Sequence, residues 1–211
     1  MRRLPVYLLI DTSGSMRGEP IESVNVGIQT MIASLRQDPY ALESVYLSII
    51  TFDKKIEEVV PLTELLHVQI PTITTPESGP TFLGKALNTL HDKVKTEVQL
   101  TTKEKKGDWM PLLFVMTDGK PSDLQDFREA VIKIKTLDFG IIVGCAAGTK
   151  AKESYLNEFC TNVVTLETTD VNSFQAFFKW VSESVSIGNK SIGAIDDISL
   201  PPPPDEINLV L

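Results

Sequence analysis

The 211-residue sequence is long enough for one α/β domain with a sizeable core, and a second domain is not expected. Its formal net charge of -8 excludes direct binding to nucleic acid or to an anionic membrane, because both depend on clustered Lys and Arg. No run approaches the roughly 18 apolar residues of a membrane span, the opening apolar run is too short for a secretion signal, and the two cysteines make no disulfide framework, so we expect a cytoplasmic protein.

The first predicted element is a strand over residues 4–10, where a continuous apolar run shows no alternation with polar residues. Such a run is typical of a parallel strand buried on both faces. It ends abruptly in the polar sequence Asp11-Thr-Ser-Gly-Ser15. Asp11, Ser13 and Ser15 lie two residues apart, so one tight turn around Gly14 would direct a carboxylate and two hydroxyls at the same point. Oxygen donors without His or Cys favour Mg²⁺, with Mn²⁺ or Ca²⁺ as alternatives, over Zn²⁺.

The rest of the chain alternates predicted strands with predicted helices. Helical spacing of apolar residues predicts helices over 20–35, 83–94, 122–134, 152–159 and 171–185, with Ser122 and Gln125 as a capping box. Apolar runs predict strands over 45–52, 111–117, 139–146 and 163–166, and a more polar run over 56–65 predicts an antiparallel edge strand. The alternation predicts a doubly wound, mostly parallel α/β sheet with helices on both faces and one antiparallel edge strand.

The alternating pattern stops near Gly188. Residues 1–187 are therefore predicted to form the domain, and residues 188–211 a proline-rich acidic C-terminal tail with neither helical nor strand period. Four successive prolines, 201–204, favour an extended polyproline conformation. The tail is expected either to be flexible or to dock through residues 209–211 onto this chain or another one.

Oxygen donors follow the strand ends in three separate loops. Asp11, Ser13 and Ser15 occupy the first, Thr81 the second and Asp118 the third. Right-handed crossovers place the strand-to-helix loops of a doubly wound sheet at one edge, so these loops can converge on one divalent cation. Each residue also has an ordinary alternative role: Thr81 as a helix cap, Asp118 as a turn residue and Ser15 as a solvated hydroxyl.

The joint pattern of Asp11-Thr-Ser-Gly-Ser15, Gly79-Pro-Thr81 and Thr117-Asp-Gly119 resembles the metal-ion-dependent adhesion site of von Willebrand factor A (VWA) domains. The resemblance covers residues 4–187. It implies Mg²⁺ or a related cation held by Asp11, Ser13, Ser15, Thr81 and Asp118, some through water, with an Asp or Glu of a partner protein completing the shell. The opening Arg-Arg-Leu-Pro-Val-Tyr-Leu-Leu-Ile-Asp is also similar to bacterial tellurite-resistance-associated VWA proteins of the TerY type. That similarity implies a stress response that includes a protein phosphatase and a protein kinase.

Two enzyme classes and a scaffold compete with this non-catalytic interaction module. Residues 79–86 nearly match a phosphate-binding loop, which would indicate an NTPase, but Ala86 replaces the hydroxyl that should hold Mg²⁺ and residues 71–78 make a poor strand. A metal-dependent phosphohydrolase would need a nucleophile and base, yet position 13 is not a second Asp, and His67 and His91 lie outside the metal loops. The third alternative is a metal-independent scaffold that docks through the C-terminal tail.

Overall fold

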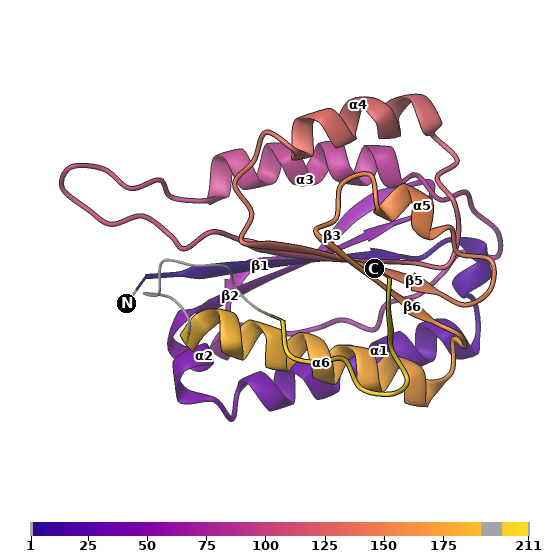
Figure 1. Cartoon of the computed structure of the whole chain (residues 1–211), viewed down its shortest axis with the longest axis horizontal. Helices are drawn as coiled ribbons and strands as arrows, with labels where there is room; N and C mark the ends of the chain where they lie inside the picture. Colours follow the sequence, from indigo (N-terminus) through magenta and orange to yellow (C-terminus); the bar gives the residue numbers. More distant parts are fainter. Residues whose placement is uncertain (1, 191–199, 211) are drawn as a thin grey trace.

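A mostly parallel sheet forms the centre of the molecule (Figure 1). The computed structural model describes residues 2–190 and 200–210, with the side chains of 188–190 left aside. Within these residues the sheet has 7 strands in the order β3-β2-β1-β4-β5-β6-β7. Their bounds are β1 Leu4–Asp11, β2 Val45–Phe52, β3 Ile56–Glu64, β4 Leu112–Thr117, β5 Ile141–Ala147, β6 Asn162–Leu166 and β7 Asn208–Val210. The five inner strands are parallel and both edge strands are antiparallel, so the predicted fold class is confirmed and β7 adds an edge strand that was not predicted.

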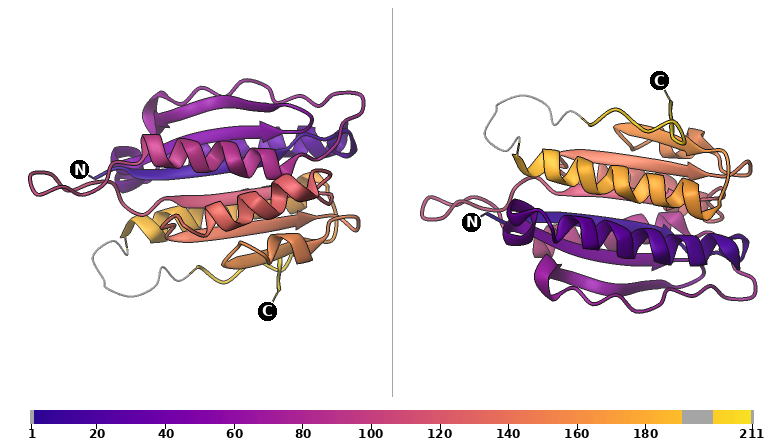
Figure 2. Two further views of the ribbon diagram at one scale, coloured as in Figure 1. Left: turned by 90° about the horizontal axis from the view of Figure 1, so that it is seen from above. Right: turned by 90° about the horizontal axis from the view of Figure 1, so that it is seen from below.

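Helices cover both faces of this sheet, as Figures 1 and 2 show from three sides. One face carries α1 Glu19–Leu35, α2 Pro39–Ser44 and α6 Val171–Lys190, and the other carries α3 Leu83–Glu97, α4 Leu124–Ile134 and α5 Glu153–Leu156. Two 3₁₀ turns, η1 Gly14–Met16 and η2 Leu65–His67, follow β1 and β3. Among the described helices, none combines the length and the apolar character needed to cross a bilayer.

Burial of β1 on both faces explains why its apolar run does not alternate. Its even-numbered residues, such as Leu8, pack in the core beneath α1 and α6, whereas Tyr7 and Leu9 pack beneath α3 and α4. Gly84 lets α3 approach α4 closely, since a Cβ there would lie 2.2 Å from the backbone nitrogen of Phe127. Both helical layers pack against a central strand that ends in the loop of residues 11–15.

The described part of the predicted C-terminal tail packs against its own chain. The indole Nε1 of Trp180 donates a hydrogen bond to the backbone oxygen of Pro201 (2.9 Å), and Ile207 is buried. Beyond it, β7 pairs with β6, opposing Leu209 to Val164. The predicted boundary at 187/188 falls inside α6, while residues 191–199 and 211 of the tail lie outside the described residues. The sequence carried no strand signal here because three residues are too few to show a period.

Candidate metal centre

The predicted metal ligands lie at the edge of the sheet where the parallel strands end. Neighbouring strands β1 and β4 pair in parallel, so their terminal loops leave the sheet side by side. The chain then turns to α1 on one face after β1 and to α4 on the other face after β4. Loops that diverge in this way leave a crevice at the strand ends, which is where open α/β sheets bind ligands.

Asp11 is the innermost residue of this crevice and has no exposed surface. Its Oδ1 accepts a hydrogen bond from the backbone nitrogen of Ser13 (2.8 Å), and its Oδ2 accepts one from Thr117 Oγ1 (2.6 Å). The turn then enters η1, where the backbone nitrogen of Met16 donates to the oxygen of Ser13. Gly14 is needed in this turn because a Cβ there would lie 2.8 Å from the Cα of Ser78. Asp11 is thereby fixed in place by its own loop and by the neighbouring strand β4.

Hydrogen bonds join the first loop directly to the third. Ser15 Oγ donates to Asp118 Oδ1 (2.8 Å), although the two residues lie 103 positions apart in the sequence. The hydroxyl oxygens of Ser13 and Ser15 lie 3.2 Å from each other. Asp118 is only 7% exposed, whereas Ser15 faces the solvent. The structure therefore brings these three predicted ligands together at the mouth of the crevice.

Thr81 reaches the same place from the loop before α3. Its backbone pairs with Ser122, accepting a bond from Ser122 N (2.8 Å) and donating one to Ser122 Oγ (3.2 Å). Its Oγ1 lies beside the turn after Asp118, because a Cβ on Gly119 would be 3.3 Å from it. Thr81 is not a helix cap, since Phe82 is the N-cap residue of α3. The predicted capping box of Ser122 and Gln125 is wrong, because the Ser122 hydroxyl binds Thr81 instead.

Burial makes the ionised form of both crevice carboxylates unfavourable. It raises the pKa of Asp11 to about 6, against hydrogen bonds from Thr117 and Ser13 that lower it. Burial also raises the pKa of Asp118, while the hydrogen bond from Ser15 and the charge of Lys150 oppose the rise. A divalent cation would relieve both carboxylates by favouring their ionised forms.

The donor set fits a hard cation. Hydrogen bonds join the side chains of Ser13, Ser15 and Asp118, Asp11 is bonded to the backbone of Ser13, and Thr81 Oγ1 lies beside Gly119. Nowhere in the described residues do three His, Cys, Asp or Glu side chains gather in a metal-binding group. Oxygen-only donors suit Mg²⁺, Mn²⁺ or Ca²⁺ rather than a thiolate or imidazole site. When bound, such an ion supplies a positive charge that attracts a further anionic ligand.

Sequence reasoning missed two residues that shape this centre. Thr117 holds Asp11 from the adjacent strand, and its position at the end of β4 was the available signal. Lys150 follows β5, and together with Ser15, Asp118 and Thr169 it lines a cavity of about 220 Å³ at the mouth of the crevice. Loops that follow parallel strands lie at one edge of the sheet, and this holds for the loop after β5 as it does for the loops after β1 and β4.

Fold and crevice together define a doubly wound domain with oxygen donors gathered at the ends of its parallel strands. The family model of the von Willebrand factor type A domain matches residues 6–180, and the chain belongs to this family. A VWA domain is typically a metal-dependent protein-interaction module. A comparison with curated proteins found no match.

Solved structures share the fold at low sequence identity. Proximal thread matrix protein 1 from the mussel byssus matches with a TM-score of 0.62 and 16% identity, over 86% of this chain and 48% of that one. A second structure of that protein, with a zinc-occupied adhesion-site motif, has a TM-score of 0.60 and 14% identity over 86% and 48% of the two chains. The manganese-loaded TRAP protein of Plasmodium vivax has a TM-score of 0.56 and 19% identity over 84% and 74%. This chain thus spans about half the length of the mussel protein.

Proposed function

We propose that this chain is a non-catalytic module that binds another protein through a Mg²⁺ ion. The observation that carries the proposal is the meeting of the first and third loops through Ser13, Ser15 and Asp118, with Thr81 beside Gly119, at a crevice whose two carboxylates are nearly fully buried. Asp11, Ser13, Ser15, Thr81 and Asp118 would hold the ion. Two carboxylates balance the charge of a dication while the hydroxyls add none, so the ion can still attract an Asp or Glu of the partner.

Local structure argues against the two enzyme alternatives. A phosphate-binding loop follows a strand, yet residues 68–82, all of them described, contain none, and Ala86 is buried in α3. Among the described side chains, the hydrogen bonds of the five proposed ligands involve no His, Cys or Lys that could serve as a base. The hydroxyl–carboxylate pairs of the crevice, Ser15 with Asp118 and Thr117 with Asp11, use carboxylates that this proposal assigns to the ion.

The partner in this proposal is a protein phosphatase or protein kinase of a bacterial tellurite-stress response, and the complex forms in the cytoplasm. The similarity of residues 2–11 to TerY-type VWA proteins supports this setting. An acidic chain of net charge -8 also needs a bridging cation to hold an acidic partner at short range.

Metal binding and partner capture test the proposal together. Titration calorimetry should give Mg²⁺ binding by the wild type and none by a Ser13→Ala/Ser15→Ala variant, and a pull-down with a co-expressed phosphatase or kinase should lose the partner in that variant or in EDTA. A Thr89→Ala/Thr96→Ala variant is the matched control, because these exposed hydroxyls bond only within α3. Capture that survives both EDTA and the Ser variant would overturn the proposal and favour docking through the C-terminal tail.

A further inference from the structure

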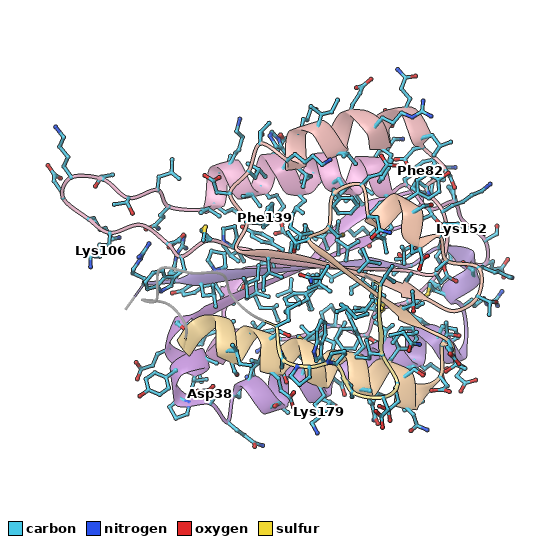
Figure 3. The ribbon with its side chains drawn as sticks, in the orientation of Figure 1. Asp38, Phe82, Lys106, Phe139, Lys152 and Lys179 are labelled. Carbon is cyan, nitrogen blue, oxygen red and sulfur yellow. The ribbon has the colours of Figure 1, made fainter. Side chains whose placement is uncertain are left out.

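A projecting loop lies at the end of the molecule opposite the metal centre. Residues 98–109, which we call the finger, join α3 to β4 and extend beyond the edge of the sheet where β1 begins (Figures 1 and 2). At its tip Lys103, Glu104, Lys105 and Lys106 are all exposed, and Figure 3 labels Lys106 there. Lys152, labelled at the other end of Figure 3, belongs to the loop after β5 beside the crevice.

The tip of the finger is held in a defined turn. The backbone nitrogen of Thr102 donates to the oxygen of Lys105 (2.9 Å). The hydroxyl of Thr102 in turn accepts hydrogen bonds from the backbone nitrogens of Glu104 (3.3 Å) and Lys105 (3.1 Å). These bonds close a turn that presents Glu104 outward at the end of the projection.

The base of the finger is fixed to the body of the domain. Asp108 donates its backbone N–H to the oxygen of Gln99 (2.7 Å), and its Oδ2 accepts a bond from the backbone nitrogen of Gln99 (2.8 Å). The guanidinium of Arg3 binds the same carboxylate through two nitrogens, at 2.9 and 2.6 Å. A loop organised at both tip and base loses little conformational freedom on binding.

The proposed ligands leave an approach to an ion on the side of Ser15. Asp11, Ser13, Thr81 and Asp118 are between 0% and 7% exposed, whereas Ser15 faces the solvent, and an acid on a projecting loop suits such a recessed site. The cavity of about 220 Å³ beside Asp118 has room for several water molecules and hence for one carboxylate side chain. Lys150 lines this cavity and would attract the same acid as the ion does.

We propose that Glu104 of one copy of this chain enters the metal centre of a second copy and completes the shell of its ion. This inference rests on the proposed function and names a partner for the same site. Because finger and crevice lie at opposite ends, a chain cannot insert its own finger, and the contact repeats head to tail. The loops at that edge carry Lys120, Lys150 and Lys152 as well as Glu77, Glu167 and Asp170, so in this proposal the attraction comes from Glu104 and not from the finger's lysines.

Sedimentation equilibrium of the full chain in Mg²⁺ tests this assembly. The weight-average mass of the wild type should rise above the monomer value of 23.3 kDa with concentration and return to it in EDTA. Glu104→Gln should remain monomeric in Mg²⁺, whereas the control Glu43→Gln, which changes an exposed acid on α2, should assemble like the wild type.

Mixing two defective variants isolates the single contact. Glu104→Gln keeps the metal centre, and Ser13→Ala/Ser15→Ala keeps the finger, so each alone should be monomeric while the mixture in Mg²⁺ forms one-to-one dimers. Binding of Mg²⁺ by the wild type in calorimetry, without any rise in mass or with assembly that Glu104→Gln leaves unchanged, would overturn the inference and leave the proposed function standing. Absence of Mg²⁺ binding would overturn both.

Discussion

The metal-free protein should be stabilised by removing the charge of its most buried predicted ligand. Asp11 has a pKa of about 6, raised from 3.8 by burial, so keeping it ionised in the folded state at pH 7.5 costs on the order of 3 kcal/mol. Asp11→Asn removes this cost and keeps the shape of the side chain. The amide oxygen can retain the bond from Ser13 N, and the Thr117 hydroxyl oxygen can accept from the new NH₂ group. In EDTA we expect the free energy of unfolding of the variant to exceed that of the wild type by about 2 kcal/mol. This figure allows about 1 kcal/mol for imperfect hydrogen bonds.

The stability difference between the wild type and the variant should depend on pH in a definite direction. The folded pKa of Asp11 lies above the unfolded value, so its protonation stabilises the fold fully below pH 3.8, and this contribution is lost as the pH rises through about 6. The amide side chain of the Asp11→Asn variant does not titrate. When the pH falls from 7.5 to 5, the free energy of unfolding of the wild type should therefore rise by about 1.4 kcal/mol relative to that of the variant.

Urea unfolding in EDTA, followed through tryptophan fluorescence to which the buried Trp180 contributes, measures both quantities. Asp138→Asn, which changes an exposed carboxylate before β5, is the control and should leave the free energy of unfolding almost unchanged. Saturating Mg²⁺ should then stabilise the wild type and not Asp11→Asn. The reasoning fails if the Asn variant is less stable than the wild type in EDTA at pH 7.5, or if their difference does not change with pH.

Three further predictions concern affinity and packing. Mg²⁺ affinity should fall by up to about tenfold per pH unit below pH 6, because a proton on Asp11 competes with the ion; affinity in calorimetry that is equal at pH 5 and 7.5 would contradict this. Gly84→Ala should destabilise the fold by about 3 kcal/mol or more in thermal melts, since its methyl group would meet the backbone of Phe127 at 2.2 Å; an unchanged melting temperature would show that α3 and α4 can separate freely. Ile207→Ala should lower the free energy of unfolding in urea by about 2–4 kcal/mol, because this residue is buried although it lies in the predicted tail. A loss no larger than that of Leu209→Ala, at the exposed edge, would argue against docking of the chain end.

The sequence by itself determined the central strands and the edge at which the ligands lie. The strand predicted over residues 45–52 has the observed bounds, because a run buried on both faces carries its signal in every residue. The parallel order of the strands then placed Asp11 and Asp118 at one edge. Thr81 follows the antiparallel strand β3 and reaches this edge only through the irregular residues 68–82.

Only the tertiary structure decided which groups support those ligands. Thr117 binds Asp11 across two strands, and the carboxylate of Asp123 caps α3 by accepting bonds from the backbone nitrogens of Gly84 and Lys85, 39 and 38 positions away. Such partners are set by the packing of distant segments, which leaves no periodic mark in the local sequence. For the same reason the pairing of β7 with β6 became visible only once the chain was folded.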